Sequence, residues 1–454
     1  MNEQVSVVAE QMLPPASKMR SGALDLALFD SRPGVAPTFP DWVPPMDEMI
    51  GECADRLDLP APLHLSTVVS LTVFIIVPTL EFAAPSACAV ELVRTLAAAG
   101  HHPIVIGRDG GRKDEIAAMG AEIIPLDTAS QNPFVMARNA VALTRLLRSR
   151  GADLIHVHGR AAAWSAYFAS RLTGIPVVAT WHKGFREQNL LKRLYNSAMA
   201  RADRIVAVSD QIADLVAERH HVPAERIAVI PPGIDIAHFN RATVSADRIA
   251  RVRHGWALKA DTKVILVTGR MLRRKGHEVV IKAAARLKQL GVKDFVCVFS
   301  ALDHGRTRYG AEIWDLVLAT RTADVIRFTG PADDLPAVYA AATIAVSSAI
   351  QPEGIQRAIL EAQAMELPVI ASDIAVGTEV VLAPPAVPEA RMTGLRFPAG
   401  DEQALAASVI RLLSMSDQNR RAMGQRGRAW IRAQFDGTAV AAQILDLYAA
   451  LARR

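Results

Sequence analysis

Short apolar runs alternate with longer amphipathic segments along the first half of the chain, starting at about Val73. The short runs are typical of buried strands, and segments with apolar residues every three or four positions are typical of helices. Helices are expected between the strands, and Gly100 and Gly174 stand where two of them would end in a left-handed turn. The alternation predicts a parallel sheet covered by helices. The expected strands are residues 72–77, 103–106, 154–157, 177–180 and 204–208, with helices such as 86–99 and 161–172.

A second series of the same kind follows the Pro231-Pro232-Gly233 segment and a polar stretch that reaches Asp261. Two α/β halves of this kind enclose a cleft, and ligands of open α/β sheets bind at the carboxyl ends of the strands. The predicted domains are residues 71–240 and 241–435, and a last helix in 436–454 is expected to pack back on the first domain. Expected strands are 264–268, 295–299, 325–329, 344–347 and 368–371, and 402–454 predicts three successive helices.

Residues 1–70 are rich in Pro, Asp, Ser and Met and show little periodicity, so they are interpreted as a flexible or loosely docked extension. Residues 59–80 contain no Asp, Glu, Lys or Arg and are long enough to span a bilayer. Pro60, Pro62 and His64 interrupt this stretch, and its dense apolar part is short and β-branched. A buried first strand after a linker is therefore the favoured interpretation, and a membrane span is the weaker one. The N-terminus has no secretion-signal pattern.

The composition predicts a folded chain of more than one domain. Of the 454 residues, 51% are apolar and 21% charged, and this length exceeds what one hydrophobic core usually holds. The net charge of +5 and a pI of about 9.2 admit nucleic acid, anionic lipid or phosphorylated ligands as partners. Nucleic acid is the weakest of these three candidates, because the sequence has no arginine-rich stripe interleaved with aromatic residues, and we expect no nucleic-acid partner.

The cysteines and histidines do not form a recognisable metal motif. Cys53, Cys88 and Cys297 are isolated in the sequence, which favours a reducing compartment and a cytoplasmic location. The pairs His101-His102 and His156/His158 lack partners at metal-ligand spacing. We therefore expect no metal site and no cofactor.

Two basic segments lie in the first half. Residues 132–150 carry four arginines and no acid, and Arg138 and Arg145 share a helix face because they are seven positions apart. Residues 184–204 are also predominantly basic. These segments predict reversible docking on the anionic inner face of the plasma membrane, with an ordinary solvated helix face as the equal alternative.

The segment that starts at Pro352, PEGIQRAILEAQAMELPVIASD, is the most informative motif. Glu353 falls in a loop and Glu361 inside the helix that follows, so the helix N-terminus would face the cleft and favour a phosphate. A carboxylate in the helix can accept two ribose hydroxyls. On spacing alone, a structural interpretation of the two glutamates is favoured over a binding site, with one capping the helix and the other exposed to solvent on it.

A second motif, VTGRMLRRKGHEVVIKAAARL, predicts a strand, a loop and a helix. Arg270 and Lys275 lie in the loop and the first turn, where they can neutralise a diphosphate, and Arg273 and Arg274 could share this work. A solvated basic loop is an equal alternative. In a third segment, His158, Arg160 and His182 follow two successive strands, so both strand ends are expected at the cleft.

Together these segments resemble the retaining glycosyltransferases of family 4, from about Val73 to the C-terminus. The glutamate pair, GRMLRRKG, IPPGID at Ile230 and ATWHKGF occur in the order typical of the family. Segments such as KRLYNSAMARADRIVAVSD resemble proteobacterial members that build envelope polysaccharide and lipopolysaccharide. The resemblance implies the GT-B fold, an α/β fold with two facing Rossmann-like domains, an acceptor-side first domain and a second domain that binds the nucleotide sugar.

The resemblance also implies an activity and residue roles. The enzyme would move a hexose from a nucleotide-diphosphate sugar to a glycan or lipid-linked acceptor, without metal. Arg270 and Lys275 would hold the donor diphosphate, and Glu361 would bind the ribose. Glu353 and His182 would lie at the donor sugar and act in catalysis.

The chain departs from the family pattern at three places. Gly354, Ile355 and Gln356 follow the first glutamate, where the family has a small residue, an apolar one and glycine; we count Gly354, Gln356, His158 and Arg160 as further cleft candidates. The glycine pair usual after Asp373 is missing, and residues 81–84 replace a glycine-rich turn. Such glycines let backbone approach sugar and phosphate, so the departures bear on donor identity.

Two other functions of the same architecture stay open. A sugar-nucleotide epimerase would need an acid/base set that the motifs do not supply. A non-catalytic sugar-nucleotide-binding protein would keep the site without turnover. A nicotinamide-dependent dehydrogenase ranks lower, because the glycines after Ile106 do not have the G-x-G-x-x-G spacing.

Overall fold

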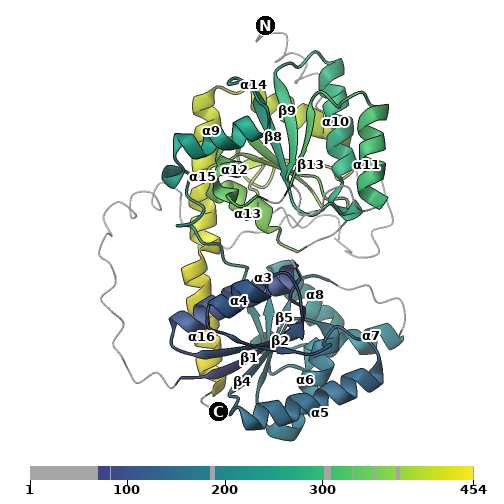
Figure 1. Cartoon of the computed structure of the whole chain (residues 1–454), viewed down its shortest axis with the longest axis vertical. Helices are drawn as coiled ribbons and strands as arrows, with labels where there is room; N and C mark the ends of the chain where they lie inside the picture. Colours follow the sequence, from purple (N-terminus) through teal and green to yellow (C-terminus); the bar gives the residue numbers. More distant parts are fainter. Residues whose placement is uncertain are drawn as a thin grey trace.

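The computed structural model describes residues 70–81, 83–184, 190–300, 308–330, 332–351, 354–374 and 379–452. These residues form two α/β domains, one above the other in Figure 1, with helices α15 and α16 running alongside both. The expected N-terminal extension, up to residue 69, lies outside the described residues, and so does Glu353.

A seven-stranded, fully parallel sheet forms the centre of the N-terminal domain, in the order β3-β2-β1-β4-β5-β6-β7. Strand β1 is central, and its Phe74 pairs with Ile104 on one side and Ile155 on the other. A strand buried on both faces needs a continuous apolar run, which β1 has. The strands are β1 (Thr72–Thr79), β2 (His102–Arg108), β3 (Glu122–Pro125), β4 (Leu154–Val157), β5 (Val177–Trp181), β6 (Arg204–Ala207) and β7 (Ile227–Val229).

Capping residues set where several helices of this domain begin and end. Asn132 accepts a hydrogen bond from the Phe134 N–H at the start of α5, and Ser209 accepts one from Ile212 at the start of α8. Gly174 ends α6 with a φ of 77°, a conformation that glycine adopts without strain. The helices are α3 (Ala84–Ala98), α4 (Lys113–Ala118), α5 (Pro133–Ser149), α6 (Arg160–Thr173), α7 (Leu190–Asn196) and α8 (Asp210–His220).

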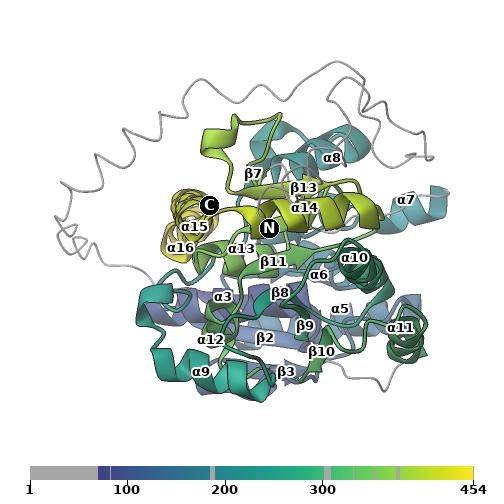
Figure 2. The same ribbon diagram turned by 90° about the horizontal axis from the view of Figure 1, so that it is seen from above.

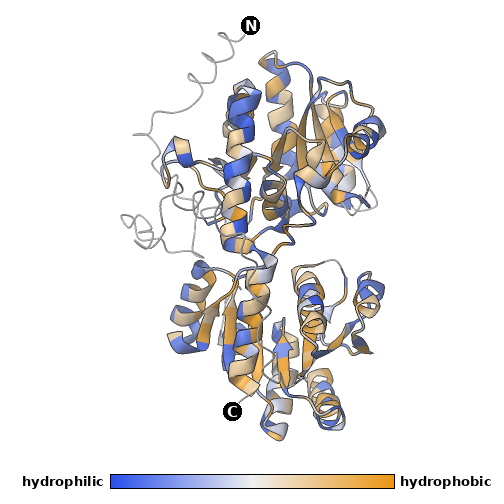
Figure 3. Ribbon diagram, turned by 90° about the vertical axis from the view of Figure 1, so that its left-hand side faces the viewer, coloured by the Kyte–Doolittle hydropathy of each residue, from blue (hydrophilic) through white to orange (hydrophobic). Residues whose placement is uncertain are grey.

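The C-terminal domain repeats this plan with a six-stranded parallel sheet in the order β10-β9-β8-β11-β12-β13. Its strands are β8 (Lys263–Thr268), β9 (Phe295–Ser300), β10 (Ile326–Thr329), β11 (Ile344–Ser347), β12 (Val369–Ser372) and β13 (Gly394–Phe397). Its helices are α9 (Ala246–Gly255), α10 (His277–Gln289), α11 (Arg308–Ala319), α12 (Leu335–Ala340), α13 (Arg357–Ala364), α14 (Glu402–Ser414) and α15 (Asp417–Phe435). The last helix, α16 (Gly437–Ala452), packs on the N-terminal domain. Both sheets bury apolar strands between helices whose outer faces are polar (Figure 3).

The prediction of two Rossmann-like α/β domains is confirmed, with local corrections. All the expected strands are present, but β3, β7 and β13 were missed because they are short edge strands of three or four residues. The polar stretch before Asp261 contains α9, which has no fully buried residue and whose Ile249 and Val252 pack against the core. Residues 72–79 form β1, so a helical membrane span over residues 59–80 is wrong. Within the described ranges, no helix has the length and apolar character needed to cross a bilayer.

The chain passes between the two domains twice, and the two passages lie side by side. Ile234 donates its N–H to the Phe435 carbonyl at 2.8 Å, and Gly437 donates to the Ile234 carbonyl at 2.9 Å. A side chain on Gly233 would have no room, because its Cβ would lie 2.8 Å from the Gly437 Cα. Seen from above, α15 and α16 nearly superpose, so the two helices follow one line across both domains (Figure 2).

Helix α16 belongs to the core of the N-terminal domain. Ile444, Tyr448 and Leu451 are buried with the residues of β1 and α3. The Tyr448 hydroxyl is hydrogen-bonded to His156 Nδ1 on β4, and His156 Nε2 is 2.7 Å from Thr180 Oγ1 on β5. Burial lowers the pKa of His156 to about 3, so the ring is neutral at neutral pH and makes one hydrogen bond at each nitrogen.

Removing the Tyr448 hydroxyl tests how firmly α16 is held. Tyr448→Phe leaves His156 Nδ1 buried without a partner, which costs about 1–3 kcal/mol of unfolding free energy. We expect a lower Tm by differential scanning calorimetry. Tyr167→Phe is the matched control, because the Tyr167 hydroxyl has no hydrogen-bond partner within the described ranges. Equal melting temperatures for the two variants would contradict the assignment.

Candidate functional site at the domain boundary

The carboxyl ends of strands from both sheets meet at the domain boundary. His158 directly follows β4 and His182 directly follows β5, while Gly354 lies between β11 and α13 of the other domain. A Cβ on Gly354 would lie 2.1 Å from the His182 carbonyl oxygen. Backbone from one domain therefore touches backbone from the other, and only glycine permits the contact.

The buried His158 and the partly exposed His182 form a close pair. His158 Nδ1 lies 3.1 Å from His182 Nε2, and the rings stack with centroids 5.3 Å apart. Burial lowers the pKa of His158 well below its usual range and that of His182 to about 4, with the Lys183 charge as a further cause for His182. Both rings are therefore neutral at neutral pH, and His182 is a weak base there.

The loop between β8 and α10 approaches the same region. Gly276 has a φ of 65°, and a Cβ there would lie 2.0 Å from the Ser348 carbonyl oxygen. This close approach brings Lys275 to the start of α13, where its Nζ donates to Gln356 Oε1 at 3.1 Å. The guanidinium of Arg270 in this loop is half-buried and makes no hydrogen bond or ion pair to any residue the structure describes.

Gln356 links the two helix N-termini. Its Oε1 accepts from Lys275 Nζ and, at 2.8 Å, from Ser347 Oγ, while its buried Nε2 has no partner among the described residues. An ammonium group only donates, so the amide orientation follows from the contact. Because Gln356 is the N-cap of α13 and Lys275 immediately precedes the N-cap of α10, an ammonium group, the Gln356 amide nitrogen and two helix N-termini converge here. Gln356, which stands where the family pattern has glycine, thus adds a carboxamide group to this cluster.

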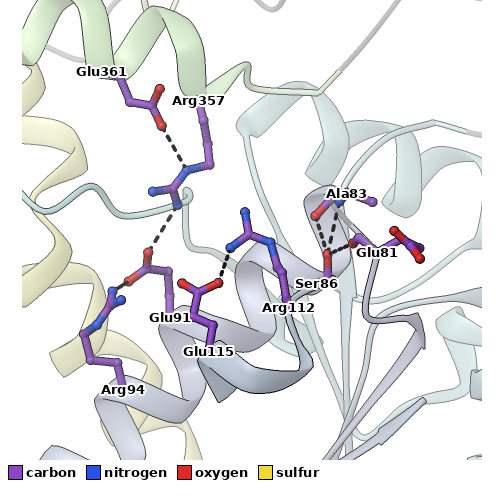
Figure 4. A network of polar contacts seen from close by, with 9 residues as sticks. All are labelled: Glu81, Ala83, Ser86, Glu91, Arg94, Arg112, Glu115, Arg357 and Glu361. Atoms are coloured by element: carbon purple, nitrogen blue, oxygen red, sulfur yellow. Dashed lines mark hydrogen bonds and ion pairs between the residues drawn. The ribbon is translucent and has the colours of Figure 1, made fainter. Parts of the chain in front are cut away.

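Glu361, further along α13, is held by a network of polar contacts. Its Oε2 accepts from the Tyr339 hydroxyl at 2.8 Å, and its Oε1 is paired with Arg357 Nε at 3.4 Å. Arg357 also reaches Glu91 Oε1 on α3 of the N-terminal domain at 3.4 Å (Figure 4). The solvated helix face considered for Glu361 is wrong, since the residue is 9% exposed. Each of its oxygens keeps a further lone pair for a ligand.

A serine stabilises the turn before α3 that lacks the expected glycines. Ser86 Oγ accepts from the Ala83 N–H at 3.1 Å, and its single proton lies between the carbonyl oxygens of Glu81 and Ala83 (Figure 4). Room for the tight turn comes from Gly110 in a neighbouring loop, where a Cβ would lie 2.2 Å from the Glu81 nitrogen. The glycine that allows the close backbone approach is therefore Gly110, outside the turn of residues 81–84 where the family pattern has its glycines.

Two of the predicted basic residues are engaged elsewhere. Arg160 donates to Asn196 Oδ1 at 2.7 Å and lies over the Tyr195 ring, so these contacts are with α7 rather than with the other domain. Arg273, which was expected to share the diphosphate site, pairs with Glu312 on α11. Neither contact could be anticipated from the sequence, because each partner is on a distant helix.

Sequence reasoning missed the partners that hold the site together. Ser347, Tyr339 and Arg357 fix Gln356 and Glu361, and Glu91 links Arg357 to α3. The position of Ser347 at the end of an expected strand was an available signal. The other residues carry no distinctive spacing.

Comparisons with known proteins agree with this architecture. The family model described as Glycosyltransferase Family 4 matches residues 86–238, and that described as Glycosyl transferases group 1 matches residues 262–415. A D-inositol 3-phosphate glycosyltransferase of Corynebacterium urealyticum is 30% identical over 323 residues, which are 66% of this chain and 72% of that protein. This chain belongs to glycosyltransferase family 4.

Other relatives match over a smaller share of their length. The protein of the same description from Salinispora tropica is 30% identical over 65% of this chain and 63% of its own length, and that from Nocardiopsis dassonvillei is matched over 54% of its length. Among solved structures, a glycosyltransferase of Rickettsia africae has a TM-score of 0.76 with 24% identity, covering 84% of this chain and 98% of its own. Anabaena HepE in complex with UDP-glucose has a TM-score of 0.69 with 19% identity, covering 84% and 100%. These likenesses show the GT-B fold.

A methyl group on Gly354 tests the contact between the domains. Gly354→Ala forces the His182 carbonyl to move, at a cost of about 1–3 kcal/mol for overpacking. We expect a larger radius of gyration by small-angle X-ray scattering, with an unchanged circular-dichroism spectrum. Gly255→Ala is the control, because a Cβ there meets nothing within 4 Å. Scattering identical to that of the unsubstituted protein would contradict this account of the boundary.

Proposed function

We propose that this family-4 chain is a retaining glycosyltransferase that moves a hexose from a nucleotide-diphosphate sugar to an acceptor bound by the N-terminal domain. The observation that carries the proposal is the convergence of Lys275, Gln356 Nε2 and two helix N-termini opposite His182. Free N–H groups, an ammonium and helix dipoles favour a doubly charged diphosphate at that point.

The proposed donor site extends from this point along α13. Lys275 and Arg270 hold the diphosphate and stabilise the negative charge that develops as the sugar leaves. Glu361, oriented by Tyr339, accepts the ribose hydroxyls through its spare lone pairs. Glu353 and His182 contact the donor sugar, as the family resemblance implies. UDP-glucose is the first donor to test, because it is bound in the HepE structure.

Net retention follows from which groups can accept a proton. An inverting transfer requires a general base that deprotonates the acceptor hydroxyl opposite the leaving group. His182 is a poor base at neutral pH, and the candidate acids Glu353 and Glu361 belong to the donor domain. In a front-face attack, the departing phosphate oxygen takes the acceptor's proton and the new bond keeps the donor's configuration. Arg270 and Lys275 supply the positive charge that a metal would otherwise provide.

The acceptor class has two candidates. The resemblance to envelope-polysaccharide enzymes favours a glycan or a lipid-linked sugar. The names of the curated relatives favour an inositol phosphate. A panel with both acceptor classes separates them, and isomerised donor or binding without turnover would instead support the epimerase or the non-catalytic alternative.

The transfer assay with site variants tests this proposal. Arg270→Ala and Lys275→Ala should each lower kcat about 10²–10³-fold, the usual effect of removing one charge-stabilising group. His182→Ala and Glu353→Gln should impair transfer more than nucleotide binding, and Glu361→Gln should weaken nucleotide binding. Proton NMR of the product should show an α linkage from an α-linked donor.

Lys282→Ala is the matched control for the diphosphate variants, because Lys282 is exposed on the same helix as the proposed site. Its kcat should equal that of the unsubstituted enzyme. A β-linked product would overturn the retaining mechanism, and near-normal turnover in both Arg270→Ala and Lys275→Ala would overturn the diphosphate assignment.

We further propose that the N-terminal domain docks on anionic lipid. Among the described residues, six of the nine exposed large hydrophobic side chains lie on α5, α6 and α7, which are grouped on one side of this domain (Figure 1). On α5, the exposed Phe134, Arg138, Val141 and Arg145 recur at helical spacing, so one face combines apolar and basic residues. Such faces are typical of helices that lie at a membrane surface. The six residues are Phe134, Val141, Phe168, Leu172, Leu191 and Leu194.

Charge reversal on this face tests the docking. Arg138→Glu/Arg145→Glu should reduce flotation with vesicles that contain phosphatidylglycerol about tenfold or more, since each basic residue contributes about 1 kcal/mol near an anionic surface. Lys259→Glu/Lys293→Glu makes the same charge change at exposed positions of the C-terminal domain and should float normally. Flotation that is independent of anionic lipid and of salt would contradict the proposal.

A further inference from the structure

Cys88, His158 and His182 converge from three separate elements. Cys88 is on α3, and the two histidines directly follow β4 and β5. One potential ligand atom from each residue lies within 4.8 Å of the other two. In the sequence the cysteine is 70 positions from the nearer of these two histidines, so residue spacing predicted no metal site here.

The dimensions of the cluster suit a tetrahedral ion. Zinc bonds of ~2.0–2.1 Å to nitrogen and ~2.3 Å to sulfur place tetrahedral ligand atoms roughly 3.3–3.6 Å apart. The nitrogens of His158 and His182 are already 3.1 Å apart. The Cys88 sulfur lies no more than 4.8 Å from the chosen atom of each histidine, so a shift of about 1.2 Å brings it to a sulfur–nitrogen separation of roughly 3.6 Å. A thiolate with two imidazoles suits zinc, whereas magnesium and calcium require oxygen ligands.

We propose that Cys88, His158 and His182 form a Zn²⁺ site that uses one sulfur and two ring nitrogens. As the sulfur–zinc bond forms, the Cys88 thiol releases its proton to solvent, and no electrons are transferred. Three protein ligands leave the fourth position to water.

Access and polar satisfaction both permit this ion. Cys88 and His182 are partly exposed, so the ion has a route in, while His158 is buried beneath them. His158 Nε2 is buried and has no partner in the described part of the chain. If the metal binds His158 Nδ1, His158 Nε2 stays without a hydrogen-bond partner, as it is in the metal-free pair. Zinc binding therefore leaves no additional buried polar atom unsatisfied.

Zinc at this site would be an inhibitor, a consequence that depends on the proposed function. The ion occupies the His182 ring, which would otherwise contact the donor sugar. Transfer should therefore fall as zinc is added and recover when a chelator removes it. A catalytic metal would produce the opposite response to the chelator.

Cobalt substitution in the metal-free, full-length protein tests the site itself. One equivalent of Co²⁺ should produce a thiolate-to-cobalt charge-transfer band in the near ultraviolet and the visible bands of a tetrahedral ion. Cys88→Ser should lose the charge-transfer band and weaken Zn²⁺ binding about tenfold or more in competition with a chromophoric chelator. Cys297→Ser, at a buried cysteine of the other domain, and Cys53→Ser should keep both properties. Absence of the band, or its persistence in Cys88→Ser, would overturn the site.

The transfer assay then tests the inhibition. Zn²⁺ should inhibit the unsubstituted enzyme reversibly, and Cys88→Ser should be active and about tenfold or more less sensitive. Cobalt binding with zinc-insensitive transfer would overturn the inhibitory role. A lack of turnover with every donor would overturn the proposed function, while the cobalt spectrum alone would still decide the metal site.

Discussion

The contact between the His182 carbonyl and Gly354 is the constraint on which the site depends. It joins the carboxyl end of β5 to the loop before α13 without any intervening side chain. Because the two backbones touch, the histidine pair of the N-terminal domain lies against the Gln356 and Lys275 cluster of the C-terminal domain. A side chain at position 354 would separate these groups, and no rearrangement of rotamers could restore the approach.

The C-terminal helix supports this contact from within the N-terminal domain. Tyr448 on α16 hydrogen-bonds to His156, whose ring lies 4.4 Å from that of His158, and His158 in turn contacts His182. A continuous series of rings therefore connects the last helix of the chain to the domain boundary. Since α16 follows α15 of the other domain directly, the same helix pair that joins the domains also packs beneath the site.

Opposite charges and shared hydrogen bonds hold Glu361 and Gln356 of the C-terminal domain in place. Arg357 lies between Glu361 and Glu91, so it links the predicted ribose-binding carboxylate to α3 of the other domain. Both ion pairs are partly exposed, and pairs of this kind contribute little to stability individually. Their effect is positional, because the hydroxyl of the buried Tyr339 fixes the second oxygen of Glu361. Gln356 is held in a similar way by Lys275 and Ser347.

The sequence by itself determined the two-domain α/β plan, its central strands and the segments that reach the boundary. Apolar runs such as that of β1 can be buried only in the middle of a parallel sheet, and this requirement is local. The sequence did not determine the edge strands or the partners of the side chains at the site. The clustering of Cys88 with His158 and His182, the link from Glu91 to Arg357 and the engagement of Arg273 by Glu312 join elements that are distant in sequence. Only the tertiary structure decided these contacts, because they depend on how strands and helices are ordered in space, which hydrophobic periodicity does not encode.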